Sequence, residues 1–361
     1  MKISSVLLLG AENILALTVI RTLGSVLPEA KIHTLSPNNR KKPATSHSKF
    51  IDSTHYFNSW DDDDLFNLLQ KKIRETGADL ILPVTDESVR VLATWKDKLN
   101  DVYLPPLPAI EVYDLLERKD LLAEFLNTNK FDNAETLRLG ETDIQRMKPD
   151  QFPVMLKPIS GSSGVGINKY CNKYSLAKTV ANIEKNNYIL QEYIPGVDFG
   201  CSILAVDGKI KAHTIQKVLA NKNFGVATAI QFTHHEQILA YTKRLLKYTG
   251  YSGVAHLDFR LDDRDGKAKL IDFNARFWAS LQGSCAAGIN FVFLSCLSAA
   301  GIPFIQPEYN HITYYIGTNT ILYYLKKALH LKKALIPQQQ VYTDFRHRIS
   351  DPLPEIARYI K

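Results

Sequence analysis

Cysteine is scarce in this sequence, and its cysteines stand alone. The 361 residues include four of them, Cys171, Cys201, Cys285 and Cys296, and no two form a C-x-x-C pair. A disulfide framework or a zinc ribbon needs cysteines at short, paired spacings, so this distribution argues against both. We therefore expect a protein that works with reduced thiols in the cytoplasm.

Long hydrophobic runs are also missing. The apolar stretch from Phe291 to Phe304 is shorter than the roughly 20 residues that a membrane-spanning helix needs, so we interpret it as a buried helix. Near the start, the apolar run at 6–9 is interrupted by Glu12 and Asn13. We interpret this run as a first buried strand rather than as a signal peptide.

The chain is basic but lacks the motifs of nucleic-acid-binding proteins. Its formal net charge is +7, and residues 301–361 contribute eight Lys or Arg against four Asp or Glu. No zinc finger, RNP motif or recognition-helix pattern accompanies this charge, so we expect no nucleic-acid partner. Anionic small molecules account for a basic site equally well.

Apolar runs and helix-start signals alternate in the first hundred residues. The apolar runs are continuous, as expected for strands of a parallel sheet that is covered on both faces. We expect strands at 3–9, 30–35 and 78–83, and helices over 12–24, after the acidic run Asp61–Asp64, and after Thr85. This rhythm predicts a Rossmann-like parallel sheet in a first domain, residues 1–105, which ends in a proline-rich stretch.

The rest of the chain has shorter strand signals with turn residues between them. The pair Asp207-Gly208, between two apolar runs, is a strong hairpin signal. We expect strands at 154–157, 188–191, 200–206, 209–216, 253–260 and 269–274, and helices over 114–127, 175–186, 235–249 and 289–300. Residues 106–300 then form a second, α+β domain, and residues 301–361 form a basic C-terminal extension.

One of these strands carries chemistry. Asp272, Asn274 and Arg276 occupy alternate positions, so their side chains should share one face of a strand. Carboxylate and amide oxygens suit Mg²⁺, and a guanidinium suits a phosphate or carboxylate. This pattern predicts a metal–nucleotide site. Asp258 on the preceding strand is by itself either a solvated carboxylate at a strand end or, in register with Asp272 and Asn274, a further metal ligand.

A glycine-rich loop follows another strand, which ends in Lys157. Its sequence is Gly161-Ser162-Ser163-Gly164-Val165-Gly166, and such residues let backbone amides approach phosphate oxygens. No Gly-Lys-Ser/Thr ends the loop, so it is not a Walker A motif, and a strand at 168–170 follows it in place of a helix. We interpret the loop as a hairpin over phosphates, with an ordinary glycine-rich turn as the alternative.

The segment Gln191-Glu192-Tyr193-Ile194 follows an apolar strand and precedes Pro195-Gly196. Backbone groups of such a linker can read an adenine ring, and Asp198 can hold ribose hydroxyls. A plain turn is the alternative. Lys217 ends an apparent strand near the site and is a candidate for contact with phosphate, or else a surface lysine.

Taken in order, these segments resemble the ATP-grasp superfamily from Lys119 to about Gly288, roughly half the chain. The resemblance implies a preceding Rossmann-like domain and a two-lobed ATP-grasp fold. It implies Lys119 and Lys157 as phosphate-binding lysines, 160–166, including Ser160, as the mobile phosphate loop, and 191–194 as the adenine hinge. The remaining roles that it implies are Asp258, Asp272 and Asn274 as ligands of Mg²⁺ (or Mn²⁺), and Arg276 on the transferred phosphate of ATP.

The stretch 277–281 further resembles carboxylate–amine ligases of the carbamoyl-phosphate-synthase-like type. This implies an enzyme that phosphorylates a small-molecule carboxylate and couples it to an amine, and homodimers are common among such proteins. Two positions depart from the family pattern: Asp272 stands for the usual Glu, and Ala275 for Pro or Thr. Neither change removes a type of ligand atom, so we expect an active enzyme.

Other functions remain open from the sequence. A carboxylase or carbamoyl-phosphate-type reaction fits the same motifs, although no biotinyl or glutaminase segment is present. A membrane-surface ATP-binding protein would use the basic, apolar stretch 321–335 as a helix, and a module that holds ATP without chemistry is a third alternative.

Three further groups have a functional and a structural interpretation. His256 should face the same side as Asp258, either to orient substrate or as a structural histidine. The acids after Thr85 could meet a substrate ammonium group, or cap a helix. His234-His235 resembles a metal pair, but we expect a helix start there with Thr233 as its N-cap.

Overall fold

The N-terminal domain is built on a parallel four-stranded sheet in the order β3-β2-β1-β4. The computed structural model describes residues 3–38, 42–161, 164–221, 225–317, 325 and 340–358. The domain contains β1 (Ser5–Leu9), α1 (Ile14–Val26), β2 (Lys31–Pro37), β3 (Ser53–Phe57), α2 (Leu65–Thr76), β4 (Leu80–Pro83) and α3 (Asp86–Trp95). The predicted Rossmann-like fold is confirmed, and only β3 was not expected, because its sequence Ser-Thr-His-Tyr-Phe is mostly polar.

The helix starts of this domain follow from its caps. Asn13 caps α1 by accepting a hydrogen bond from the backbone N–H of Ala16 at 3.0 Å. Thr85 caps α3 in a capping box with Ser88, as the sequence indicated. Gly77 ends α2 in the left-handed conformation, with φ of 62°, where a side chain would be strained. Asn13 and Thr85 follow β1 and β4 and so start their helices at the carboxyl edge of the sheet, whereas Gly77 precedes β4 at the opposite edge.

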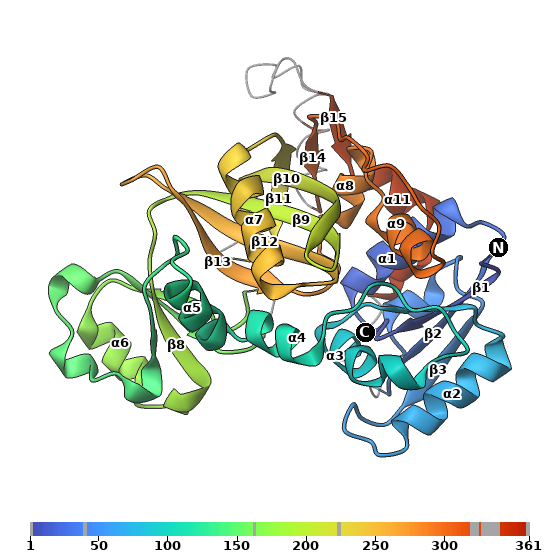
Figure 1. Ribbon diagram of the computed structural model, residues 1–361, viewed down its shortest axis with the longest axis horizontal. Coiled ribbons are helices and arrows are strands. Elements are labelled where there is room, and N and C mark those ends of the chain that lie inside the picture. Colours follow the sequence, from blue (N-terminus) through green and yellow to red (C-terminus); the bar gives the residue numbers. More distant parts are fainter. Residues whose placement is uncertain are drawn as a thin grey trace.

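The second domain has two lobes, which Figure 1 shows to the left of the N-terminal domain. The smaller lobe has an antiparallel sheet, and the larger lobe has a sheet that is antiparallel except for the pair β14–β15. The smaller sheet has the order β5-β8-β6-β7. It contains β5 (Thr136–Arg138), β6 (Val154–Pro158), β7 (Asn168–Tyr170) and β8 (Tyr188–Glu192), with α6 (Lys173–Val180) packed on it. Leu156 and Leu190 lie in the core between this sheet and α6, so the other face of β6 and β8 is turned toward the larger lobe.

The larger sheet has the order β13-β12-β9-β10-β11-β14-β15. Its strands are β9 (Gly196–Val206), β10 (Lys209–Asn221), β11 (Ala227–Phe232), β12 (Gly253–Asp262), β13 (Ala268–Asn274), β14 (Thr313–Tyr315) and β15 (Val341–Thr343). The helix α7 (Glu236–Thr249) covers one face, and α8 (Leu281–Ala286) and α9 (Phe291–Ala299) separate the other face from α1. The predicted two-lobed ATP-grasp fold is thus confirmed.

The structure has two helices in one segment where the sequence predicts a single helix. The segment predicted as a helix over 114–127 forms α4 (Ile110–Glu117) and α5 (Lys119–Thr128). Arg118 between them has an extended backbone, with φ of −79° and ψ of 115°. Because of this break, Lys119 starts a new helix and its side chain is buried. The helix expected over 175–186 ends at Val180, and the remaining short turns are 3₁₀: η1 (Ala44–His47), η2 (Lys96–Lys98), η3 (Leu139–Glu141), η4 (Ile144–Arg146), η5 (Pro149–Gln151) and η6 (Lys185–Asn187).

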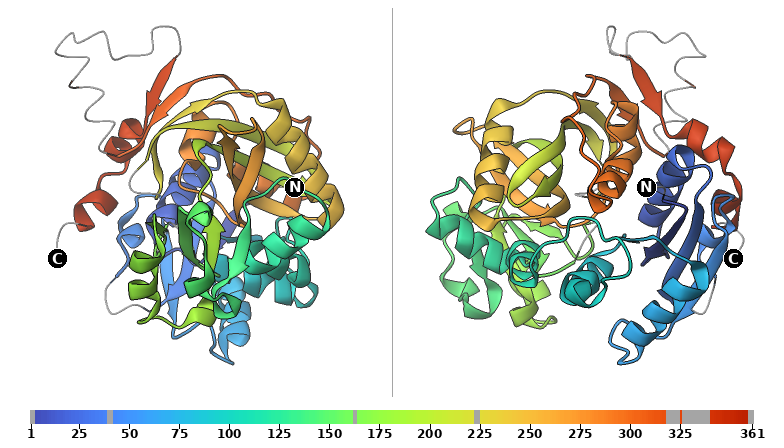
Figure 2. Two further views of the ribbon diagram at one scale, coloured as in Figure 1. Left: turned by 90° about the vertical axis from the view of Figure 1, so that its left-hand side faces the viewer. Right: turned by 45° about the vertical axis from the view of Figure 1, so that its right-hand side comes forward.

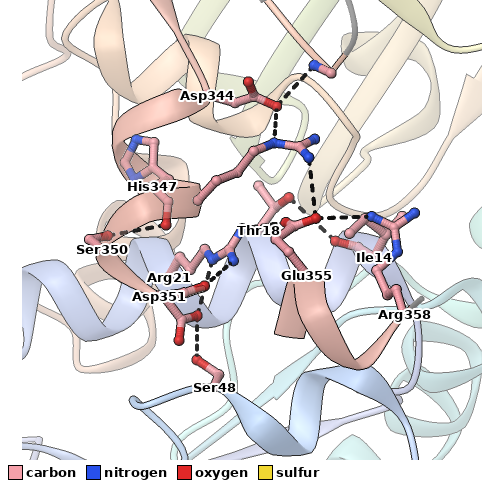
Figure 3. A network of polar contacts seen from close by, with 12 residues as sticks. Ile14, Thr18, Arg21, Ser48, Asp344, His347, Ser350, Asp351, Glu355 and Arg358 are labelled. Carbon is pink, nitrogen blue, oxygen red and sulfur yellow. Dashed lines mark hydrogen bonds and ion pairs between the residues drawn. The ribbon is translucent and has the colours of Figure 1, made fainter. Parts of the chain in front are cut away.

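The last described segment joins both domains. After β15 completes the large sheet, α11 (Phe345–Ser350) and α12 (Leu353–Ala357) run beside the N-terminal domain, as Figure 2 shows in red and blue. Buried Arg21 of α1 donates to the Asp351 carboxylate at 3.1 Å and to Glu355 at 3.2 Å (Figure 3). Residues far apart in sequence therefore hold α11 and α12 against α1.

Two expectations about the C-terminal part have different outcomes. The helix expected over 321–335 lies outside the described residues except for Leu325. Within the described ranges, no helix combines the length and apolarity needed to cross a bilayer. The domain limits at 105 and 300 stay predictions.

Candidate active site

A cavity of about 230 Å³ lies between the small sheet and the large sheet. Strands β6 and β8 line one side, and β9, β10, β12 and β13 line the other. Most of the predicted site residues border it: Lys157, Gly164, Gln191, Glu192, Tyr193, Ile194, Asp198, Asp258, Asp272, Asn274 and Arg276. Segments separated by up to 119 positions in the sequence thus meet in one space, as expected for a single ligand site.

The three predicted metal ligands lie next to one another on paired strands. Asp258 of β12 is the direct partner of Asp272 on β13, and Asn274 is paired with His256. The Asn274 side-chain amide donates to Asp258 Oδ2 at 3.0 Å. Two carboxylates and an amide on adjacent strands form a set of hard oxygen donors that suits a divalent cation such as Mg²⁺.

The two predicted phosphate lysines reach this site from different elements. Lys157 of β6 donates to Gln191 Oε1 at 2.7 Å and to the Ile271 carbonyl at 3.3 Å. Burial lowers the pKa of Lys157 to about 8, although the Asp272 carboxylate opposes that change. Lys119, at the start of α5, is buried with its Nζ 3.3 Å from Asp272 Oδ1. Both ammonium groups therefore lie beside the acidic cluster and can balance a polyphosphate.

The glycine-rich loop is tied to Lys119. The Gly161 carbonyl accepts a hydrogen bond from Lys119 Nζ at 3.1 Å, and the Ser160 hydroxyl donates to Glu117 at 3.2 Å. Gly166 has φ of 76°, and a side chain there would come within 2.9 Å of the Pro158 ring. The loop thus needs glycine where it turns back over β6. Ser162 and Ser163 lie outside the described residues.

The predicted adenine hinge includes an aromatic ring between two cations. The Lys169 ammonium lies 3.4 Å from the Tyr193 ring centroid, and the Arg260 guanidinium lies 5.0 Å from it. Arg260 also lies 3.4 Å from Asp198 Oδ1. Burial raises the pKa of Asp198 above its usual range, and the Arg260 charge opposes this. The sequence showed no signal for Arg260, because its role depends on a strand pairing with β9.

Arg276 extends the site toward the N-terminal domain. Its Nη2 donates to Asn274 Oδ1 at 3.2 Å, and its Nε donates to Asp86 Oδ2 at 2.9 Å. Asp86 is the first residue of α3, next to the capping residue Thr85. Thr85 therefore takes the capping role that was one of its two interpretations, while Asp86 holds the guanidinium of Arg276.

His256 is held from two sides. One ring nitrogen, Nδ1, is 2.8 Å from the Ser202 hydroxyl, and the other is 3.4 Å from Asp258 Oδ1. Its ring also stacks on Trp278, with centroids 5.7 Å apart. Nearby, buried Gln216 accepts a hydrogen bond from Ser280 at 3.0 Å. Gln216 and Ser280 line the cavity without any motif in the sequence to indicate them.

Two predictions need correction. Lys217 does not border the cavity among the described residues, whereas its neighbours Gln216 and Val218 do. Since side chains alternate along a strand, Lys217 points to the other face of β10, and the predicted phosphate contact is not supported. The N-cap of α7 is His235 and not Thr233, because His235 Nδ1 accepts from the Ile238 N–H at 3.5 Å.

Comparisons with known proteins agree with this geometry. A family model described as "ATP-grasp in the biosynthetic pathway with Ter operon" matches residues 184–311. The chain has the ATP-grasp fold, and its residues 184–311 are similar to this family, as the sequence resemblance indicated.

The individual relatives and solved structures have low sequence identity to this chain. D-aspartate ligase of Enterococcus faecium is 22% identical over 256 residues, covering 64% of this chain and 61% of that protein. D-alanine–D-alanine ligase B of Clostridium tetani is 26% identical over 167 residues, covering 42% of this chain and 46% of that one. The structure of an L-amino acid ligase from Bacillus licheniformis superposes with a TM-score of 0.64 at 16% identity, covering 82% of this chain and 74% of that chain. The chain thus spans about half to three fifths of the curated relatives it matches.

Proposed function

We propose that the protein is an ATP-dependent carboxylate–amine ligase. It transfers the γ-phosphoryl group of ATP to a carboxylate oxygen and releases ADP. An amine nitrogen then attacks the acyl carbon, loses a proton and displaces phosphate. The observation that carries this proposal is a single cavity lined by Lys157, Asp258, Asp272, Asn274 and Arg276, with buried Lys119 in contact with Asp272. The named relatives, ligases of aspartate and alanine, support amino-acid-like substrates.

ATP would lie along the cavity with its adenine at the hinge and its phosphates at the lysines. The backbone of 191–194 would contact the base, and Asp198, held by Arg260, would accept from ribose hydroxyls. Lys119 and Lys157 would contact the α and β phosphates. Phosphoryl transfer depends mainly on positioning and on charge neutralisation, and this arrangement of cations supplies both.

The donor set fits a resident Mg²⁺ or Mn²⁺. Asp258, Asp272 and Asn274 would hold it, and the ion would neutralise charge on the β and γ phosphates. The Asp272 carboxylate already attracts a cation, since Lys119 Nζ lies 3.3 Å from it. Asp272 is one methylene shorter than the glutamate of the family pattern, so its carboxylate reaches less far from β13.

The acyl phosphate would form between Arg276 and the N-terminal domain. Arg276 is fixed by Asp86, Asn274 and the Phe277 carbonyl, so its guanidinium faces the developing charge without reorganising. The glycine-rich loop would close over the phosphates and keep water from the acyl phosphate.

An acidic group is available for the amine substrate at the carboxyl edge of the parallel sheet. Glu12 follows β1, and its Oε2 is buried with no hydrogen-bond partner among the described residues. Burial raises the pKa of Glu12, and the neighbouring Glu87 carboxylate adds to this. A bound ammonium group would satisfy both carboxylates, so we place the amine substrate between α3 and the start of α1.

A cytoplasmic setting is part of this proposal and is supported by the cysteines. All four cysteines are described and carry free thiols, which fits a reducing cytoplasm. Assembly as a homodimer stays a prediction from the resemblance. A carboxylase or carbamoyl-phosphate-type reaction is the second candidate, since it would use the same ATP site with bicarbonate as the carboxylate.

The test is a screen for ADP and phosphate release by the purified protein with pairs of amino acids, and with bicarbonate alone. We expect release that requires both a carboxylate and an amine partner, together with a coupled product by mass spectrometry. Release that depends on bicarbonate and no amino acid would favour the second candidate. Absence of turnover with every pair, while ATP still binds, would contradict the ligase proposal.

A further inference from the structure

The two C-terminal helices are attached to the body of the protein through their charged residues. Asp351 accepts hydrogen bonds from Arg21 and from the Ser48 hydroxyl, the latter at 2.8 Å. Glu355 binds Arg21 at 3.2 Å and Arg348 at 3.2 Å (Figure 3). Asp351 is 1% exposed. The side of α11 and α12 that faces α1 is therefore ionic.

The apolar side chains of the same helices face solvent instead. Ile349, Leu353 and Ile356 are 60%, 57% and 50% exposed. Leu353 and Ile356 are three residues apart on α12 and therefore share one side of that helix, while Ile349 lies on α11, before the helix break at Asp351. An amphipathic helix normally buries its apolar side, because each fully buried aliphatic chain contributes about 1.5–3 kcal/mol. Here the orientation is reversed, which marks an interaction surface.

Charge around this surface favours an anionic occupant. The acids of the segment are used within the protein: Asp344 binds Arg348 at 2.8 Å, and Asp351 and Glu355 bind Arg21. Arg346 and Arg358 are exposed. A second copy of the same basic surface would be repelled, whereas anionic headgroups would be attracted.

We propose that the exposed face of α11 and α12 formed by Ile349, Leu353 and Ile356 docks on an anionic phospholipid surface. The aliphatic side chains would insert at the level of the headgroups and the flanking arginines would lie among the phosphates. This mode of binding needs no membrane-spanning helix. It places the protein at a membrane while the cavity between the two sheets stays available, and it does not depend on the proposed reaction.

The test is sedimentation of the full chain with vesicles. One set is made of phosphatidylcholine and phosphatidylserine in equal parts, and the other of phosphatidylcholine alone. We expect binding to the first set, at least ~10-fold weaker binding to the second, and loss of binding as salt is raised from about 0.1 M to about 1 M. Equal binding to both sets, or no binding to either, would overturn the proposal.

Variants distinguish vesicle binding through this surface from nonspecific adsorption of the protein to vesicles. Ile349→Ser should weaken vesicle binding about 10-fold, as expected for one aliphatic chain removed from an apolar contact. Ile305→Ser is the matched control, since Ile305 is 93% exposed and lies outside these helices. Leu353→Ser provides a second variant if Ile349→Ser alters the circular dichroism spectrum. Equal binding of both surface variants and the control would overturn the proposal. It would also be overturned if the protein did not bind vesicles but formed a dimer that Ile349→Ser dissociates.

Discussion

Asp86 of the N-terminal domain holds Arg276 of the ATP-grasp domain by a hydrogen bond of 2.9 Å between Oδ2 and Nε. The Arg276 side chain is 9% exposed, and that of Asp86 is 27% exposed. The contact joins residues 190 positions apart and fixes the guanidinium that we propose acts on the transferred phosphate. On this proposal Asp86 is a positioning residue through which the first domain contributes to the geometry of the site.

Replacing Asp86 by Asn should lower kcat for ATP turnover by roughly 10- to 100-fold, because a charge-assisted hydrogen bond of ~1.5–3 kcal/mol is lost. The KM for ATP should change little, since Asp86 does not border the nucleotide. Asp114→Asn is the control: Asp114 also pairs with an arginine, Arg90, but on the exposed side of α3. A selective rise in KM with unchanged kcat would contradict the positioning role.

Removing the charge-bearing residues of the site should abolish turnover while the fold persists. We expect Arg276→Ala and Asp272→Ala each to reduce ATP turnover at least ~100-fold, since one positioned charge contributes about 3 kcal/mol. Steady-state ADP release measures the effect, and the melting temperature reports on folding. Lys217→Ala, on the other face of β10, should retain activity. Turnover close to wild type in either site variant would refute the assignment.

ATP affinity should depend on pH through Lys157. Burial lowers its pKa to about 8, so its ammonium charge is lost as pH rises through that value. Titration calorimetry should show ATP binding that weakens above pH 8, and Lys157→Met should bind more weakly and without this dependence.

The lowered pKa of Lys157 affects stability in the opposite direction from ATP binding, because a higher pH favours the folded chain. Between about 8 and the ordinary lysine value of 10.5, the unfolded chain binds the proton that the folded chain lacks. Lys157 therefore makes the free energy of unfolding rise with pH in this window. Denaturant titrations of the wild type and Lys157→Met should differ in that slope. Parallel curves would indicate that Lys157 keeps an ordinary pKa.

Breaking the buried ion pair beneath α11 should be costly. Asp351→Ala leaves the Arg21 guanidinium buried without its carboxylate, which commonly destabilises by about 3–5 kcal/mol. The midpoint of urea unfolding measures the loss. Arg358→Ala removes a half-exposed partner of Glu355 and should cost at most ~0.5 kcal/mol. Similar midpoints for the two variants would show that the C-terminal helices do not stabilise the N-terminal domain.

Local patterns predicted most of the fold. The continuous apolar run of β1 and the alternating Asp272, Asn274 and Arg276 lie where their periodicity indicated. Strands β11, β14 and β15 were missed because they are short or carry mixed side chains whose burial comes from the neighbouring strand. The break at Arg118 was missed because Arg is a good helix former, and only tertiary contacts extend its backbone.

For the same reason, some residues of the site could be predicted from the sequence and others could not. Residues within one motif, such as Lys157 or Asn274, could be found because their neighbours in sequence define their role. Asp86, Arg260 and Gln216 act across sheets or domains, so no local spacing reveals them. Lys217 shows the converse, since closeness to the site in sequence did not decide which face of β10 it occupies.

The Arg21–Asp351 contact also bears on how the protein is made. The two residues are 330 positions apart, so at 5–20 residues per second a ribosome needs roughly 15–65 seconds between them. Throughout that interval α1 carries a cation without the carboxylate that will cover it. The N-terminal domain therefore gains its ionic contact with α11 and α12 only after the intervening 330 positions have been synthesised.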